Sequence, residues 1–285
     1  MLKLRLFCPL AVLILVICVL TVPVLAQNSP NFKEDAAGNK FDPALTGLGA
    51  TTTTFTVPDP VCPNISVKAR LSRPTRTGDD LLDEALSLEL RQVSRKVATG
   101  FSLGADSLSD CPEHVTLDEP GEVTEFFEAH SPSAGILSVL FTRFESLPWA
   151  AHPNQGYDVL NYNLTKGQEL TLDDLFPEGL VTASLWGVVA KEWCSFNDYK
   201  KLPSFYGLSE DTDWCAKPDS IPLPASLTTY PISLKSLGNG YLTKDGLVLQ
   251  LGAYEGWSYA DGPSTLLISK DTLKKLGAKA SIWPQ

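Results

Sequence analysis

The chain has 285 residues, of which 44% are hydrophobic and 20% are charged, a balance typical of a globular protein with a buried core. This composition excludes a disordered, collagen-like or multi-span membrane protein. The formal net charge is −10, from 23 basic and 33 acidic residues, which excludes binding to nucleic acid through charge attraction. A charged partner of this protein would be basic.

The first 26 residues have the pattern of an export signal. Lys3 and Arg5 precede an uncharged stretch, residues 6–26, that ends in a typical secretory cleavage site. Cleavage would start the mature chain at Gln27 and leave 21 basic against 33 acidic residues, a net charge of −12. The alternative is an uncleaved membrane anchor, since about 20 apolar residues span a bilayer. In both cases the rest of the chain is expected to be extracytoplasmic, periplasmic or secreted, with membrane contact only through this segment if it stays uncleaved.

Four cysteines remain beyond the export signal, and an even number in an exported chain indicates disulfides. Three sets of pairings are possible, and proximity in the sequence favours Cys62–Cys111 together with Cys194–Cys215. Each bond would stabilise the fold by about 3–4 kcal/mol in the chain-entropy model. The sequence has no Cys-x-x-Cys pair, and its three histidines lack ligand spacing, so we expect no metal and no other cofactor.

The order of the expected elements predicts an α+β fold, in which antiparallel sheets pack with helices. Residues 27–50 are rich in Asn, Asp, Gly and Pro and are expected to form a flexible tether. Residues 51–164 are expected to form the first half, which starts with strands over 53–57 and 65–71. Residues 165–285 are expected to form the second half.

The first half is expected to contain a long amphipathic helix. Asp79 or Asp80 caps its beginning, Gly100 ends it, and its apolar residues recur at three- and four-residue steps on one face. Strands over 122–130, 135–144 and 157–164 follow, and the economical arrangement for them is an antiparallel meander.

The second half is expected to contain a short helix at Asp173, a helix over 180–193 and a terminal helix capped by Ser269. Asn239-Gly240 and Asp245-Gly246 are typical of hairpin turns, so strands are expected around them.

An envelope hydrolase that acts on cell-wall polymer is the alternative to a binding function. The run Gly100-Phe101-Ser102-Leu103-Gly104 matches the Gly-x-Ser-x-Gly of serine hydrolases, but it follows a helix, whereas the nucleophile has to leave a strand. A carboxylate pair for glycoside cleavage could come from Asp173, Asp174, Glu178, Glu255 and Asp261. Asp173 and Asp174 are equally explained as first-turn residues of a short helix. We therefore assign no catalytic residue.

Two loops carry the residues that we select as binding candidates. His152 and Asn154 are expected in a loop before a strand. His152 is either a structural histidine with its hydrogen bonds satisfied or part of a loop that contacts a partner, because loops on rigid sheets often carry binding residues. Tyr254, Trp257 and Tyr259 form an aromatic cluster that is either core packing or the anchor of a recognition surface.

Several stretches resemble the extracytoplasmic domain of the lysozyme-sensing anti-sigma factor RsiV, a domain also found N-terminal to certain peptidoglycan deacetylases. They are Ala151-His152-Pro153-Asn154 and residues 163–176, 243–247 and 254–262, and their order and spacing match over most of 51–277. The resemblance implies a bacterial, extracytoplasmic α+β domain of two related sheet-and-helix halves, without an active site of its own. In the anti-sigma factor this domain binds lysozyme. It implies neither disulfide and transfers no lysozyme-contacting residue to this chain.

The chain also departs from this family. Only five residues precede the hydrophobic segment, so we expect no cytoplasmic sigma-binding domain and carry over the extracytoplasmic domain alone. The expected function is therefore that of an exported, non-enzymatic binding module of the bacterial envelope. The expected partner is a basic protein such as lysozyme, or peptidoglycan, because an acidic module would gain association rate from a basic partner.

Overall fold

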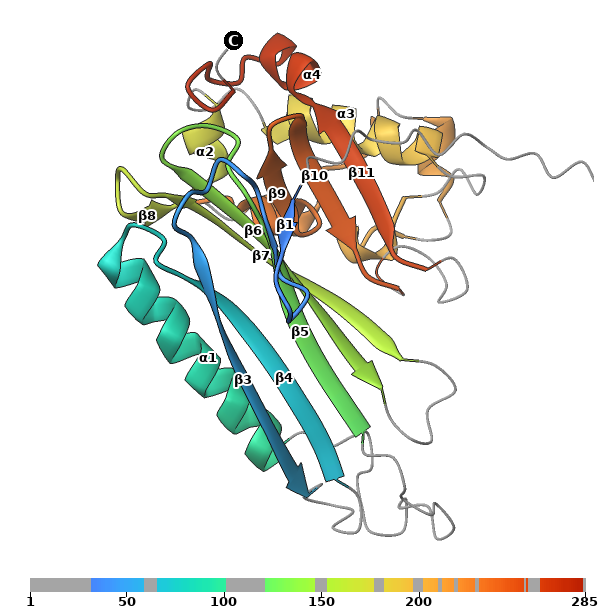
Figure 1. Cartoon of the computed structure of the whole chain (residues 1–285). Helices are drawn as coiled ribbons and strands as arrows, with labels where there is room; N and C mark the ends of the chain where they lie inside the picture. Colours follow the sequence, from blue (N-terminus) through green and yellow to red (C-terminus); the bar gives the residue numbers. More distant parts are fainter. Residues whose placement is uncertain are drawn as a thin grey trace, which may run out of the picture. The chain divides into compact units, whose positions relative to one another are not determined.

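Two β-sheets and four α-helices make up the part of the chain that the computed structural model describes (Figure 1). This part comprises residues 32–58, 66–100, 121–146, 153–176, 182–196, 202–209, 212–217, 220–228, 231–253, 255 and 262–283. The α+β class expected from the sequence is confirmed. The export signal and the expected Cys62–Cys111 pair lie outside the described residues. Within them, no helix is long and apolar enough to cross a membrane.

The large sheet is built around an antiparallel meander of three strands, as the sequence predicts. These strands are β5 (Gly121–His130), β6 (Ile136–Ser146) and β7 (Asn154–Asn163). β4 (Ser66–Thr75) runs parallel to the first half of β5, and β3 (Gly49–Pro58) pairs antiparallel with β4. Three two-residue strands complete the sheet: β1 (Lys33–Glu34), β2 (Lys40–Phe41) and β8 (Gln168–Glu169).

The helix α1 (Asp80–Gly100) covers one face of the large sheet, and it has the bounds that the sequence predicts. The Asp79 carboxylate accepts a hydrogen bond of 3.0 Å from the Leu82 N–H and so caps the first turn. Leu82 and Leu86 are buried against Phe127, Ala129, Leu137, Val139 and Phe141 of the sheet. The apolar face of the helix therefore forms one side of the core.

The small sheet contains β9 (Gly240–Thr243), β10 (Gly246–Leu251) and β11 (Ser264–Ser269), all antiparallel. It shares a second core with α2 (Leu172–Leu175), α3 (Thr182–Phe196) and α4 (Lys270–Lys275), in which Trp193 and Trp283 are fully buried. Ser269 caps α4 as expected, because its hydroxyl accepts a hydrogen bond of 3.2 Å from the Thr272 N–H. Short 3₁₀ turns connect these elements: η2 (Ser204–Tyr206), η3 (Trp214–Ala216), η5 (Ala225–Leu227) and η6 (Leu234–Leu237).

The Cys194–Cys215 disulfide is present and confirms that expected pairing. Its Cα atoms are 5.4 Å apart, and it links the last turn of α3 to η3 across 21 residues of sequence. The bond closes a loop that contains η2, and such a link stabilises the fold mainly by restricting the unfolded chain.

The small sheet packs on the side of the large sheet away from α1, and neutral polar groups join the two. The Asn161 amide on β7 donates to the Gly240 carbonyl on β9 at 2.8 Å. The Ser138 hydroxyl on β6 donates to the Asn161 side-chain oxygen at 2.7 Å and accepts from the Leu242 N–H at 2.7 Å. Leu140, Val159, Tyr241 and Val248 form an apolar cluster at the same junction.

The segment expected as a flexible tether, residues 27–50, is structured from Phe32 onward, which corrects that prediction. The reason lies in the hydrogen bonding of β5. Along one edge, β5 pairs with β4 over residues 121–125 and with β2 over residues 128–129, which leaves a gap between the two partners. The Asn39 side chain, which is fully buried, fills this gap and accepts a hydrogen bond of 3.1 Å from the Phe127 N–H. Asp35 fixes Asn39 in turn through a 2.9 Å hydrogen bond from the Asn39 amide.

One of the two predicted hairpin turns is wrong. Asp245 lies in the turn between β9 and β10 as expected, but Asn239-Gly240 leads from η6 into β9. Gly240 is needed for close packing, because a β-carbon there would lie 2.6 Å from the Leu234 carbonyl oxygen. Asn239 adopts a left-handed φ of 47°, and its side-chain amide donates to the Gln250 carbonyl.

Candidate binding surface

The two sides of the large sheet have different environments. Arg73 on β4 forms ion pairs with Glu125 on β5 and with Glu89 on α1, so the odd-numbered residues of β4 and β5 face the helix. Side chains alternate along a strand, and Arg70 and Phe126 therefore point to the opposite side. The hydrogen bond between the Thr52 and Ser72 hydroxyls places the even-numbered residues of β3 on that side too.

The small sheet covers only the half of this opposite side that lies around Leu140 and Val159. In the other half, Thr52, Thr54 and Thr56 along β3 are all exposed. Figure 1 shows the same arrangement, with β9–β11 beside one end of the long strands. We call this half, which no described helix or strand covers, the open face. It is defined by Thr52, Thr54, Thr56, Lys68, Arg70, Phe126, Phe144 and Tyr157.

An aromatic pair lies in the middle of the open face. The Phe126 and Phe144 rings are stacked, with centroids 5.8 Å apart and an interplanar angle of 25°, and both side chains are partly exposed. Tyr157 is their neighbour, because Phe126 and Tyr157 both pair with Thr142, from opposite sides. Partly exposed aromatic rings surrounded by hydroxyl groups are typical of recognition surfaces, where a ring supplies contact area at low entropic cost.

Arg70 extends this surface toward β3. It pairs in register with Thr54 on one side and with Thr124 on the other. Its side chain makes no ion pair with any described residue, and its Nε atom is buried without a hydrogen-bond partner. A guanidinium with unused donors beside aromatic rings is equipped to bind a carboxylate or a carbonyl oxygen of a partner.

Of the selected residues, Asn154 is described: it begins β7 at the rim of the open face and does not lie in a loop before the strand, which corrects that expectation. Asn154 is exposed at the first residue of β7, opposite Glu145 of β6. A β-carbon on Gly252 would lie 3.0 Å from the Gln155 carbonyl oxygen, so the end of β10 contacts the start of β7. Four of the selected residues lie outside the described part of the chain: His152, Tyr254, Trp257 and Tyr259.

Glu255 anchors this rim. Its carboxylate accepts a hydrogen bond of 2.7 Å from the Gly252 N–H, and its carbonyl oxygen accepts from the Phe205 N–H at 2.9 Å. Burial raises the pKa of Tyr157 to about 12, and the negative charge of Glu255 acts in the same direction. The Tyr157 hydroxyl, which accepts a hydrogen bond from the Gln155 amide, is therefore neutral at physiological pH.

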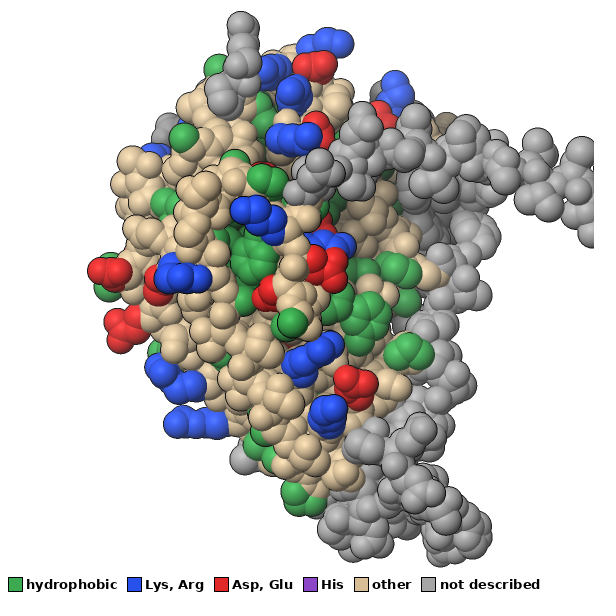
Figure 2. Space-filling model, viewed as in Figure 1, with side chains coloured by type: hydrophobic (Ala, Val, Ile, Leu, Met, Phe, Trp, Pro, Cys, Tyr) green, Lys and Arg blue, Asp and Glu red, His purple; other side chains and the backbone are tan. Residues whose placement is uncertain are grey.

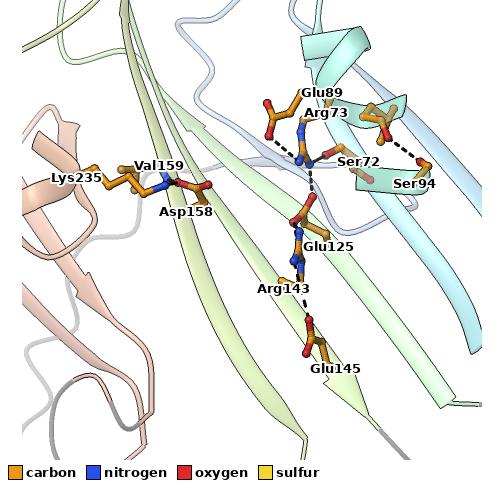
Figure 3. A network of polar contacts seen from close by, with 11 residues as sticks. Ser72, Arg73, Glu89, Ser94, Glu125, Arg143, Glu145, Asp158, Val159 and Lys235 are labelled. Atoms are coloured by element: carbon orange, nitrogen blue, oxygen red, sulfur yellow. Dashed lines mark hydrogen bonds and ion pairs between the residues drawn. The ribbon is translucent and has the colours of Figure 1, made fainter. Parts of the chain in front are cut away.

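The side of the large sheet that faces α1 contains a buried ion network (Figure 3). Glu125, with 4% of its side chain exposed, is paired with Arg73 and, at 2.9 Å, with Arg143. Arg73, with 3% exposed, also pairs with Glu89 at 3.1 Å, and its guanidinium carbon lies 4.6 Å from the centre of the Phe141 ring. Each carboxylate of the network has a basic partner, so these contacts are explained by the fold alone.

The electrostatics of this network follow from burial and pairing. Burial disfavours the charge of Arg73, but the Glu125 and Glu89 carboxylates outweigh it and raise the pKa of Arg73 above its ordinary value. Burial also raises the pKa of Glu145, at the outer end, against the effect of Arg143. The charge of Glu145 is thus disfavoured by its burial.

Among the acidic residues considered for catalysis, Asp174 has a structural role, whereas one carboxylate oxygen of Asp173 is buried without a hydrogen-bond partner. The Asp174 carboxylate accepts hydrogen bonds from the Thr171 N–H at 3.1 Å and from Lys166 at 3.1 Å, which confirms its role as a helix-capping residue. Ser102, Glu178 and Asp261 lie outside the described residues. Among the described residues, no group of three His, Cys, Asp or Glu side chains could hold a metal ion.

Sequence reasoning missed the open face, although a signal for it was present. Side chains alternate along a strand, so Phe126 and Phe144 point to the side of the sheet opposite to the core residues Phe127 and Phe141. Two aromatic residues at solvent-phase positions of neighbouring strands indicate a surface patch rather than core.

No protein-family model matches the chain, and no curated protein matches it. Solved structures that are similar to the chain include the following two. One is a DUF3298 family protein from Pseudomonas aeruginosa PAO1, with 17% identity over 84% of this chain and 97% of that chain and a TM-score of 0.48. The other is a DUF3298 family member from Bacteroides fragilis NCTC 9343, with 15% identity over 82% of this chain and 94% of that chain and a TM-score of 0.47.

Proposed function

We propose that this protein is an exported, non-enzymatic binding module of the bacterial envelope that holds a cell-wall-associated partner on its open face. The observation that carries the proposal is the partly exposed Phe126–Phe144 pair beside Arg70, whose guanidinium lacks a charged partner among the described residues. Aromatic rings and Arg are the residues that contribute most binding energy at protein interfaces.

Export is supported by two independent features. The first 26 residues have the pattern of a signal segment, and the Cys194–Cys215 disulfide is a bond that persists mainly in oxidising compartments. A rigid sheet with a fixed surface suits a binding module, because little ordering entropy is lost when a partner docks.

A lysozyme-like enzyme is the partner that we propose first. The resemblance of residues 151–154, 163–176, 243–247 and 254–262 to the RsiV extracytoplasmic domain supports this choice. The net charge of −10 supports it as well, because an acidic protein attracts a basic enzyme at long range and raises the association rate. Peptidoglycan itself is the second partner to be tested.

The test is calorimetric titration of the purified protein with a cationic lysozyme and, separately, with soluble peptidoglycan fragments, each at two salt concentrations. We expect saturable binding to lysozyme that weakens as salt rises. The Thr54→Arg variant, which adds bulk and positive charge to the open face, should lower the affinity about tenfold or more, which corresponds to about 1.4 kcal/mol.

Thr51→Arg is the matched control. Thr51 is an exposed threonine on the same strand, but it pairs with Arg73 and so lies on the α1 side. The control should bind like the unchanged protein, because it has the same charge change on the other side of the sheet. Equal loss in both variants would place the binding site elsewhere, and absence of heat with lysozyme would contradict the proposed partner.

A further inference from the structure

The outer face of α1 has an apolar stripe. Among the described residues, the exposed large hydrophobic side chains are Leu81, 75% exposed, and Leu88, 48% exposed. Both lie on α1, seven residues apart, and Ala85 between them is also exposed. With 3.6 residues per turn these three positions follow one line along the helix, on the side opposite the buried Leu82, Leu86 and Leu90.

Charged residues flank this stripe in an ordered way. Asp80 and Glu84 occupy the first half of the helix, and Arg91 and Arg95 occupy the second half. Steps of four, seven and four residues place all four on the same flank of the stripe. In Figure 2 red side chains lie over the beginning of α1, at the left, and blue side chains lie further down the same edge.

We propose that the α1 stripe binds a second copy of this chain, helix against helix and antiparallel, around a two-fold axis near Leu88. In this arrangement the flank of one helix faces the same flank of the other with its direction reversed. Glu84 of one copy then lies level with residues 91–95 of the other, so each acidic half meets a basic half. Leu88 packs on its own counterpart at the centre.

The charge pattern favours a second copy over an unrelated partner. The same flank of α1 contains acidic residues in its first half and basic residues in its second half, so two antiparallel copies match each other in charge. The contact is a single pair of helices of 21 residues each, about 30 Å long. Such an interface is smaller than the roughly 800 Å² per subunit that is typical of stable complexes. We therefore expect association that depends on protein concentration and weakens as salt rises, instead of a permanent dimer.

The test is sedimentation velocity on the purified protein over a wide concentration range, at low and high salt. We expect a shift from monomer to dimer as the concentration rises. Leu88→Glu should abolish the shift, because it puts two carboxylates together on the axis. The Thr54→Arg variant on the opposite side of the sheet should associate like the unchanged protein.

Charge reversal tests the antiparallel direction. Glu84→Arg alone and Arg91→Glu alone should each weaken the dimer about threefold or more, and the two together should restore it, since the complementarity is then inverted but intact. Both residues are exposed, so each variant should keep its thermal unfolding temperature, which is measured in parallel. A protein that stays monomeric at every concentration, or a dimer that survives Leu88→Glu, would overturn the proposal.

Discussion

The two sides of the large sheet each bury polar groups, but of different kinds. On the α1 side Glu125 and Arg73 are buried as charges, and on the side of the small sheet Ser138 and Asn161 are buried as neutral groups. Removing a charge from water costs several kcal/mol per ion, and an amide or hydroxyl costs much less. The comparison teaches that the helix side depends on complete pairing, whereas the junction with the small sheet depends on individual hydrogen bonds.

The largest effect is expected from breaking the charged cluster on one side only. Glu125→Gln leaves the buried Arg73 without its main counter-charge and should lower the free energy of unfolding by about 3–5 kcal/mol, measured by urea denaturation. Glu145→Gln is the control, since Glu145 lies 4.0 Å from Arg143 at the outer end and its charge is already disfavoured by burial. A similar loss in the control would contradict this account.

Replacing both charges should cost less than replacing one. In a protein with Arg73→Met and Glu125→Leu together, no buried charge is left unpaired between β4 and β5, and Arg143 is 34% exposed and can be hydrated. We expect the double variant to unfold with a free energy at least about 1 kcal/mol higher than that of Glu125→Gln. Equal denaturation midpoints for the two proteins would show that packing, not unpaired charge, dominates the cluster.

The neutral junction should respond more weakly. Asn161→Ala removes the hydrogen bond to the Gly240 carbonyl and a partner of Ser138, and it should cost about 1–3 kcal/mol in the same denaturation experiment. Ser138→Ala should cost less, because the Leu242 N–H also lies 3.3 Å from the Asn161 side-chain oxygen. A larger loss of unfolding free energy in Asn161→Ala than in Glu125→Gln would contradict the difference that we infer between the two sides of the sheet.

The smallest effect is expected at the surface, from the Asp174 cap. Burial opposes its ionisation, but hydrogen bonds from Thr171 and Lys166 lower the pKa of Asp174 below its ordinary 3.8. A carboxylate with a lowered pKa stabilises the fold above its unfolded pKa, and this contribution is lost as the pH falls through the folded pKa. Asp174→Asn should therefore cost about 0.5–1 kcal/mol at neutral pH, and this cost should shrink as the pH falls below 3.8. A difference that persists at low pH would exclude the carboxylate charge as its cause.

Much of the fold follows from periodicity. The alternation of Val67, Ala69 and Leu71 and the three- and four-residue steps of α1 predict elements that the structure confirms, because a single buried face imposes those periods. The segment around Asn39 could not be predicted in this way. Its two-residue strands have no period, and its role, to fill a gap in the β5 ladder, depends on residues about ninety positions away.

The candidate site was predictable only in part. Among the binding candidates that the sequence selects, only Asn154 lies in the described part of the chain, at the start of β7 beside the open face, so the role of the others stays a prediction. The contribution of Arg70 was not readable, because the absence of a partner for a side chain is a property of the assembled sheet. The expected division at residue 165 and the non-enzymatic function stay predictions.

Hydrogen–deuterium exchange of the protein with and without cationic lysozyme tests the proposed binding surface most directly. β3 pairs only with β4 among the described strands, so its outward amides exchange readily and report any partner that lies along it. We predict that lysozyme slows exchange over residues 50–58 and 154–157 and leaves α1 unchanged. Protection confined to other segments, or identical exchange in both samples at saturating lysozyme, would contradict binding on the open face.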